Sequence, residues 1–238
     1  MGLKDQINQA LSDLVGHDWQ VTQGTVVPKT ENIVLKNGAR ELDAVYLYAD
    51  MMGSTKLVTE FPPGTAAKVM RAFLATACRI IRSHDGHIRS FDGDRVMGIF
   101  VGERKNSRAV QAAMEIKYAT DNFVRPALER KLPSLVTKGF ALSHVCGVAS
   151  GKVFIARAGI RDHNDLISVG QAANIAAKLS DIRETPQKRT YITKAVFDTM
   201  ANDVQVSSDG RPMWEESVQT VNGTRTTVYR SGWGWVIS

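Results

Sequence analysis

Two acidic residues, Asp50 and Asp94, have the type and spacing that metal-dependent phosphoryl chemistry requires. Asp50 closes the apolar run in AVYLYADMMGSTKL (44–57), and Asp94 lies at the tip of HIRSFDGDRVMGIF (87–100). Two carboxylates at one edge of a sheet supply the hard oxygen ligands that Mg²⁺ and Mn²⁺ prefer, and two such ions support phosphoryl transfer. Each motif alone also fits a helix cap or a hairpin turn. Their pairing, with each acid closing an apolar run, favours the metal site.

Three small residues, Gly53, Ser54 and Thr55, follow the first acid at the expected start of a helix. Backbone N–H groups at a helix N-terminus, together with the positive end of the helix dipole, attract phosphate groups. The stretch therefore predicts that the acid holds metal and that the small residues hold the phosphates of a nucleotide.

The elements that must position these residues alternate between strand and helix patterns. The order predicts an α+β fold with a mostly antiparallel sheet and a ferredoxin-like βαββαβ core, in which the first and third strands are neighbours. Asp50 and Asp94 should therefore meet at one edge. We expect a helix over 4–15, an extended lead-in over 16–38, a strand over 44–49, a long helix after Pro62-Pro63-Gly64, a hairpin over 87–100, a helix over 106–128, strands over 139–149 and 151–157, a helix over 171–180 and a late hairpin through Asn222-Gly223.

Length and composition fit one large domain with an N-terminal extension. The chain has 238 residues, of which 43% are hydrophobic, and we divide it into an N-terminal helix and lead-in (1–40) and a catalytic domain (41–238). The apolar surroundings of Cys78 and Cys146 indicate reduced core residues, and no run is long enough to span a membrane, so we expect a cytoplasmic protein. The net charge of +6 (30 basic minus 24 acidic residues) favours an anionic partner without naming it.

Four segments, in chain order, resemble motifs of the class III nucleotidyl cyclases, the adenylate and guanylate cyclase family. YADMMGST and GHIRSFDGDRVMGIF are similar to the two metal motifs of that family. VCGVASGKVFIARAG resembles the strand, turn and strand that follow, and SVGQAANIAAKLSDI resembles the helix that carries a transition-state Asn and, four residues on, an Arg. The matches cover about 43–182.

The resemblance implies a role for each matching residue. Asp50 and Asp94 would bind two Mn²⁺ or Mg²⁺ ions, with the main-chain carbonyl of Met51 as a further ligand. Asn174 would orient the ribose. Lys178 stands where the family usually has Arg, so the positive charge remains but the bidentate fork is lost. Because Asn174 and Lys178 are one turn apart on a helix, they can serve one ligand.

Two further basic residues could contact the β- or γ-phosphate. Lys152 lies in an expected Ser-Gly-Lys turn between two strands, and Arg225 lies in the late hairpin. An exposed lysine in a turn is an equally simple interpretation of Lys152.

The positions that select the base depart from the purine cyclases of the family. Those enzymes place Lys or Glu four residues before the second metal Asp, and Asp, Thr or Cys seven residues before the Asn; here the positions hold Ser90 and Ile167. Neither side chain offers a charged contact to a purine edge, which favours a smaller base. Arg89 and Tyr48 could supply a donor and a stacking face, or could simply be a solvent-facing arginine and a core tyrosine.

The chain most resembles the pyrimidine cyclases of the bacterial Pycsar antiphage system, which make cyclic UMP or cyclic CMP to activate a separate effector protein. The resemblance favours UTP over CTP and implies a homodimer with two shared active sites, without a nucleic-acid or membrane partner. Two alternatives stay open: a purine cyclase with a divergent base pocket, and an inactive nucleotide-binding regulatory module. The presence of Asp50, Asp94 and Asn174 argues against the second.

Overall fold

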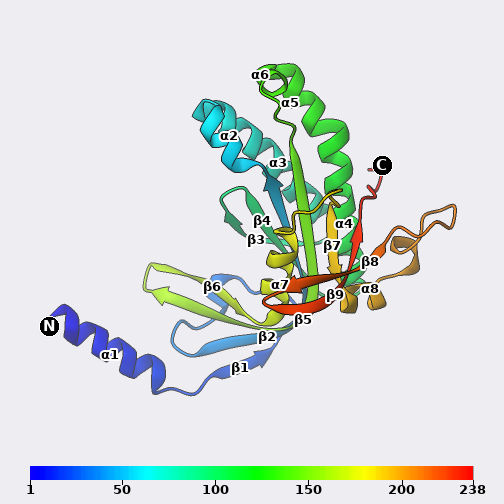
Figure 1. Cartoon of the computed structure of the whole chain (residues 1–238). Helices are drawn as coiled ribbons and strands as arrows, with labels where there is room; N and C mark the ends of the chain where they lie inside the picture. Colours follow the sequence, from blue (N-terminus) through cyan, green and yellow to red (C-terminus); the bar gives the residue numbers. More distant parts are fainter. Residues whose placement is uncertain (238) are drawn as a thin grey trace.

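A nine-stranded sheet forms the centre of the computed structural model, which describes residues 1–237 (Figure 1). The strands run in the order β3-β4-β2-β5-β7-β9-β8, with β1 added to β2 and β6 added to β5. Their bounds are β1 (Gln20–Gln23), β2 (Gly38–Met52), β3 (His87–Asp92), β4 (Arg95–Phe100), β5 (Ser143–Ile160), β6 (His163–Val169), β7 (Thr190–Thr193), β8 (Glu215–Val221) and β9 (Thr224–Ser231).

The helices connect these strands and cover the sheet, apart from α1, which extends away from the body with none of its residues buried (Figure 1). Within the residues described, no helix combines the length and apolar character needed to cross a membrane. The bounds are α1 (Leu3–Val15), α2 (Ser54–Glu60), α3 (Pro63–Ser83), α4 (Lys105–Ala119), the π-helical turn η2 (Thr120–Val124), α5 (Arg125–Lys131), α6 (Ser134–Thr137), α7 (Gln171–Ser180) and α8 (Lys194–Thr199), with 3₁₀ turns η1 (Thr30–Asn32) and η3 (Asn202–Val204).

The predicted α+β architecture is confirmed. The segment β2-α3-β3-β4-α4-β5 places its strands in the spatial order β3-β4-β2-β5, so the first and third strands of the ferredoxin-like unit are neighbours. Antiparallel pairing joins β3 to β4, β4 to β2 and β2 to β5, whereas β1 with β2 and β5 with β7 are parallel.

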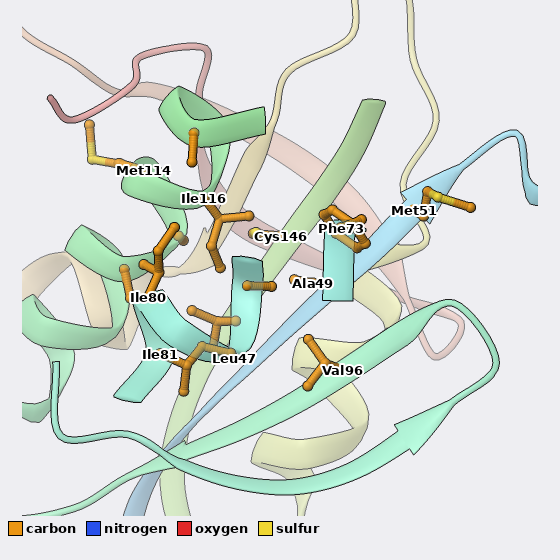
Figure 2. Packing of buried hydrophobic residues seen from close by; sticks show 14 of the residues in the cluster. Leu47, Ala49, Met51, Phe73, Ile80, Ile81, Val96, Met114, Ile116 and Cys146 are labelled. Carbon is orange, nitrogen blue, oxygen red and sulfur yellow. The ribbon is translucent and has the colours of Figure 1, made fainter. Parts of the chain in front are cut away.

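The inner strand β2 is buried on both faces, because consecutive residues are apolar and successive side chains point to opposite faces of the sheet. One set packs with α3 and α4: Val45, Leu47, Ala49 and Met51. Figure 2 shows the last three of these among residues of both helices. The other set, Leu42, Ala44 and Tyr46, packs with α7. Since side chains alternate along a strand, Asp50 continues the second set and points to the face that α7 covers.

The predicted turn at Ser150-Gly151-Lys152 is wrong, because β5 is one continuous strand from Ser143 to Ile160. Every residue of β5 up to Ala156 has a partner on β2, from Met52↔Ser143 to Ala39↔Ala156. This pairing satisfies the backbone of the Ser-Gly pair without a turn. The expected strands over 139–149 and 151–157 are therefore halves of one strand.

The N-terminal lead-in contributes to the sheet. β1 pairs in parallel with the start of β2, in the register Gln20↔Gly38, and β2 begins before the expected strand over 44–49. The division into an extension (1–40) and a catalytic domain (41–238) stays a prediction. The last residue of the chain, 238, lies outside the described residues. The expected helices over 4–15 and 171–180 and the hairpin through Asn222-Gly223 are present as α1, α7 and β8-β9.

Candidate active site

Asp50 and Asp94 come together where β2 meets the β3-β4 turn. Asp50 lies opposite Arg95 in the β2-β4 register, and Asp94 is the residue just before Arg95. Asp50 precedes the end of β2 by two residues, and its side chain is only 14% exposed. The sheet therefore holds one carboxylate on a rigid strand and brings the other to it from a hairpin turn.

The electrostatics of this pair favour a cation. Burial raises the pKa of Asp50, the nearby negative charge of Asp94 raises it further, and the hydrogen bond from Arg183 opposes both effects. Within residues 1–237, the buried Oδ2 atom of Asp94 has no hydrogen-bond partner. A buried carboxylate oxygen without a partner costs free energy that a bound cation would recover.

The main chain next to Asp50 also fits a metal ligand. β2 pairs with β4 only as far as Asp50↔Arg95, whereas its pairing with β5 continues to Met52↔Ser143. At Met51 the edge of β2 that faces the β3-β4 turn has no strand partner among the described residues. Within 1–237, no group of three or more His, Cys, Asp or Glu side chains is placed to hold a metal. A cation here would therefore complete its shell with main-chain, water or substrate oxygens, as Mg²⁺ commonly does.

The glycine after the strand turns the chain into α2. Gly53 adopts a left-handed conformation (φ 77°), and the N–H of Leu57 donates to its carbonyl at 3.0 Å. A side chain at this φ would be strained. Ser54 and Thr55 are the first residues of α2, so their N–H groups have no partner within the helix. Phosphate binding by this turn stays a prediction.

The two helical residues of the site lie on the exposed side of α7. Asn174 and Lys178 are exposed, and the Nζ atom of Lys178 lies 3.8 Å from Asp181 Oδ2. The opposite side of α7 rests on β5 at Gly147, where a Cβ atom would come within 2.1 Å of the Ala176 carbonyl oxygen. The absence of a side chain at Gly147 thus allows this helix to lie against the sheet.

Two of the predicted base-recognition residues share one patch. Tyr48 and Ser90 both lie opposite Met97, from β2 and β3 respectively, so their side chains are on the same face of the sheet. Tyr48 is half-buried, and the guanidinium of Arg95 lies over its ring at 5.2 Å. The Tyr48 ring thus lies between the core and the carboxylate edge.

Arg89 and Ile167 lie differently from these two residues. A bulge between Ile88 and Ser90 displaces Arg89, which forms an ion pair with Asp165 on β6. Ile167 lies opposite Ala156 on the β5-β6 hairpin and is 46% exposed. The strand alternation turns its neighbours inward, whereas Ile167 points away from the patch. Within one chain the structure does not bring Ile167 to Ser90.

The predicted phosphate contacts Lys152 and Arg225 are not joined to the carboxylate pair. Lys152 is an exposed residue of β5 that lies opposite Asp43 on β2. Arg225 lies next to the turn of the β8-β9 hairpin, opposite Thr220. Their roles stay predictions.

Comparisons with known proteins agree on the kind of protein. No family model matches the chain. A curated "Uridylate cyclase" from Xanthomonas perforans is 41% identical over 239 residues, covering 100% of both chains. Proteins of the same name from Rhodovulum sp. (strain MB263) and Burkholderia cepacia are 39% and 35% identical and cover at least 97% of each chain. The chain belongs to this family of cyclases.

Solved structures show the same fold. A bacterial light-regulated adenylyl cyclase superposes with a TM-score of 0.69 at 19% identity, covering 83% of this chain and 53% of that one. The guanylyl cyclase Cya2 superposes with a TM-score of 0.66 at 17% identity, covering 82% and 94%. The protein is a nucleotidyl cyclase with the class III fold.

Three charged residues at the carboxylate edge of the cyclase were not among the predicted site residues. Arg183 donates to Asp50 Oδ2 at 2.8 Å. Arg95 pairs with Asp92 at 2.7 Å and with Asp181 at 3.3 Å. Arg95 could have been found, because it follows Asp94 in the turn and faces Asp50 once the strand register is assumed. Asp181 caps the end of α7 and Arg183 follows two residues later. No local pattern places either residue beside β2.

Proposed function

We propose that this cyclase converts UTP to 3′,5′-cyclic UMP and pyrophosphate. Full-length similarity to three curated uridylate cyclases carries the proposal. The buried carboxylate pair, Asp50 with the unpartnered Oδ2 of Asp94, supports it independently. Ser90 and Ile167 offer no charged group to a purine edge, and a site without such contacts does not select a purine.

Two divalent cations, Mn²⁺ or Mg²⁺, would be held by Asp50, Asp94 and the main-chain carbonyl of Met51. When bound, such ions would lower the pKa of the ribose 3′-hydroxyl and neutralise charge on the triphosphate. The amides of Gly53, Ser54 and Thr55 would hold the β- and γ-phosphates, with Lys152 as a further contact.

In the proposed reaction the ribose 3′-oxygen forms a bond to the α-phosphorus. The bond between that phosphorus and the oxygen bridging to the β-phosphate breaks in line, the hydroxyl proton passes to solvent, and pyrophosphate leaves. Asn174 would orient the ribose, and Lys178 would contact the α-phosphate oxygens. The exposure of both side chains on one side of α7 supports this pairing.

Recognition of the base would use the patch shared by Tyr48 and Ser90. The half-buried ring of Tyr48 would offer a rigid face for a pyrimidine once the Arg95 guanidinium, which lies over the ring at 5.2 Å, moves aside. The hydroxyl of Ser90 offers a short donor and acceptor on the same face of the sheet. Arg89 would contribute a donor only after leaving Asp165. CTP is the second substrate to test, because both pyrimidines fit such a patch.

The wider role follows the resemblance to the Pycsar cyclases. We propose that two chains form a homodimer with two shared sites, in which one chain supplies the carboxylate pair and its partner supplies Asn174 and Lys178. The product would act in the cytoplasm on a separate effector protein in antiviral defence.

A competition assay tests the substrate. With Mn²⁺ and all four ribonucleoside triphosphates at equal concentration, we expect cyclic UMP as the main product, formed at least about tenfold faster than cyclic AMP or cyclic GMP, or roughly 1.4 kcal/mol in barrier. Chromatography separates the products. A dominant purine product would reject the proposal, and a dominant cyclic CMP product would keep the pyrimidine class but change the substrate.

A further inference from the structure

The guanidinium of Arg183 bridges the end of α7 and the carboxylate edge. Its Nη2 atom donates to Asp50 Oδ2 at 2.8 Å. Its Nη1 atom donates to the carbonyl oxygens of Ser180 and Ile182 at 2.8 and 3.0 Å. The guanidinium is therefore held by hydrogen bonds on both of its terminal nitrogens. Through these bonds it connects β2 to the end of α7, the helix that carries Asn174 and Lys178.

Arg183 is the cation that contacts Asp50 directly. Arg95 is near, but its guanidinium is already shared between Asp92 at 2.7 Å and Asp181 at 3.3 Å. The Asp50 side chain is 14% exposed and that of Arg183 is 41% exposed. A largely buried acid is thus neutralised by a cation that can leave into solvent without unpacking the core.

The Oδ2 atom of Asp50 cannot accept the hydrogen bond from Arg183 and bind a divalent cation at the same time. A divalent cation bound to Asp50 Oδ2 would sit beside the guanidinium that now donates to that atom, and like charges a few ångströms apart repel strongly where water is partly excluded. The unpartnered Oδ2 atom of Asp94 adds negative charge that one guanidinium does not balance. The excess negative charge therefore favours binding of a divalent cation, whereas the positive charge of Arg183 disfavours it.

We infer that Arg183 is a built-in counter-ion that stabilises the metal-free carboxylate pair and must be displaced from Asp50 when a divalent cation binds. The inference rests on the proposed metal site. Without metal, the Arg183 guanidinium neutralises Asp50 and holds the end of α7 against β2. The same contact weakens the affinity of the site for the first cation. Metal binding then breaks the Arg183–Asp50 link between β2 and the end of α7.

The test is the affinity of the nucleotide-free protein for Mn²⁺, measured by isothermal titration calorimetry at pH 8. Arg183→Gln removes the competing charge and should tighten binding about fivefold, the size expected for a partly exposed ion pair. Arg183→Lys keeps the charge and should stay within about twofold of wild type. Arg104→Gln is the matched control, because Arg104 pairs at 3.1 Å with Asp203, which is outside the site.

Melting temperature gives a second readout that separates competition from a structural role. Arg183→Gln should lower the melting temperature without Mn²⁺ and should increase the gain in melting temperature on adding Mn²⁺, relative to wild type. A residue that only supports the fold would lower both temperatures equally.

Asp50→Asn separates failure of the inference from failure of the metal site. If Asp50→Asn abolishes Mn²⁺ binding while Arg183→Gln binds no more tightly than wild type, the counter-ion role is wrong and the metal assignment stands. Equal tightening in Arg183→Lys and Arg183→Gln would also reject the role, since the lysine keeps the charge. If Asp50→Asn binds Mn²⁺ like wild type, the metal site and the inference both fall.

Discussion

At the scale of single residues, Asp94 is the sharper probe of the proposed metal site, because none of the described side chains pairs with its buried Oδ2 atom. Asp94→Asn keeps the shape and removes the charge, so we expect turnover to fall at least about a hundredfold with the fold intact. Asp92→Asn, at an exposed carboxylate of the same hairpin turn, should keep more than about a tenth of the activity. Initial rates and circular dichroism of both variants provide the comparison, and similar losses in the two would argue against a specific role for Asp94.

The two cysteines differ in burial and should differ in reactivity. Cys146 is fully buried, and burial raises the pKa of its thiol to about 12; burial also raises the pKa of the half-buried Cys78. Because the thiolate is the reactive form, iodoacetamide at pH 8 should label at most Cys78 in the folded protein, and slowly. Both thiols should react in denaturant. Intact-mass measurement counts the labels, and rapid double labelling of the folded protein would contradict the burial of Cys146.

At the scale of elements, two glycines of β5 give a matched test of how α7 is seated. A Cβ atom at Gly147 would come within 2.1 Å of the Ala176 carbonyl oxygen and 2.6 Å of the Ser180 nitrogen, both backbone atoms of α7. At Gly151 the nearest atom is the Ala172 Cβ at 3.7 Å, an ordinary contact. Gly147→Ala should therefore push α7 off the sheet, lower stability by about 1–3 kcal/mol and reduce activity.

Gly151→Ala should stay close to wild type in both respects. Urea unfolding and initial rates of the two variants decide the matter. If the two substitutions behave alike, the close approach of α7 at Gly147 does not govern its position.

Local patterns predicted the elements of the site better than its contacts. The meeting of Asp50 and Asp94 was predictable because Asp50 ends an apolar strand, Asp94 lies in the turn of the next hairpin, and the βαββαβ order makes β2 and β4 neighbours. The turn at Ser150-Gly151 was predicted wrongly because its composition favours a turn locally, whereas pairing with β2 decides the conformation.

Contacts between segments far apart in the chain could not be predicted from local sequence patterns. Arg183 and Asp50 are 133 positions apart, and nothing within either segment indicates that the chain after α7 returns to β2. The orientation of Ile167 depends on the register Ala156↔Ile167 of the β5-β6 hairpin, which no local sequence pattern indicates. A shift of one residue would have turned that side chain to the other face.

At the scale of the whole molecule, the proposed homodimer makes a prediction about mixed subunits. Asp50→Ala and Asn174→Ala should each be inactive alone. In a mixed dimer one site receives the intact carboxylate pair from one chain and Asn174 from the other, so equal mixing should restore roughly a quarter of wild-type activity. The rate after mixing is the measurement, with native mass spectrometry to verify subunit exchange. Exchange without recovered activity would reject the shared site.

The position of β2 between β4 and β5 has a consequence for the newly made chain. β2 is synthesised early, yet its register runs from Ala39↔Ala156 to Met52↔Ser143, so its longest partner, β5, follows only after α3, the β3-β4 hairpin and α4. Until β5 leaves the ribosome, one whole edge of an apolar strand stays open, and such edges pair readily with the wrong chain. The nascent protein therefore exposes the β5-facing edge of β2 to pairing with other chains until β5 has been synthesised.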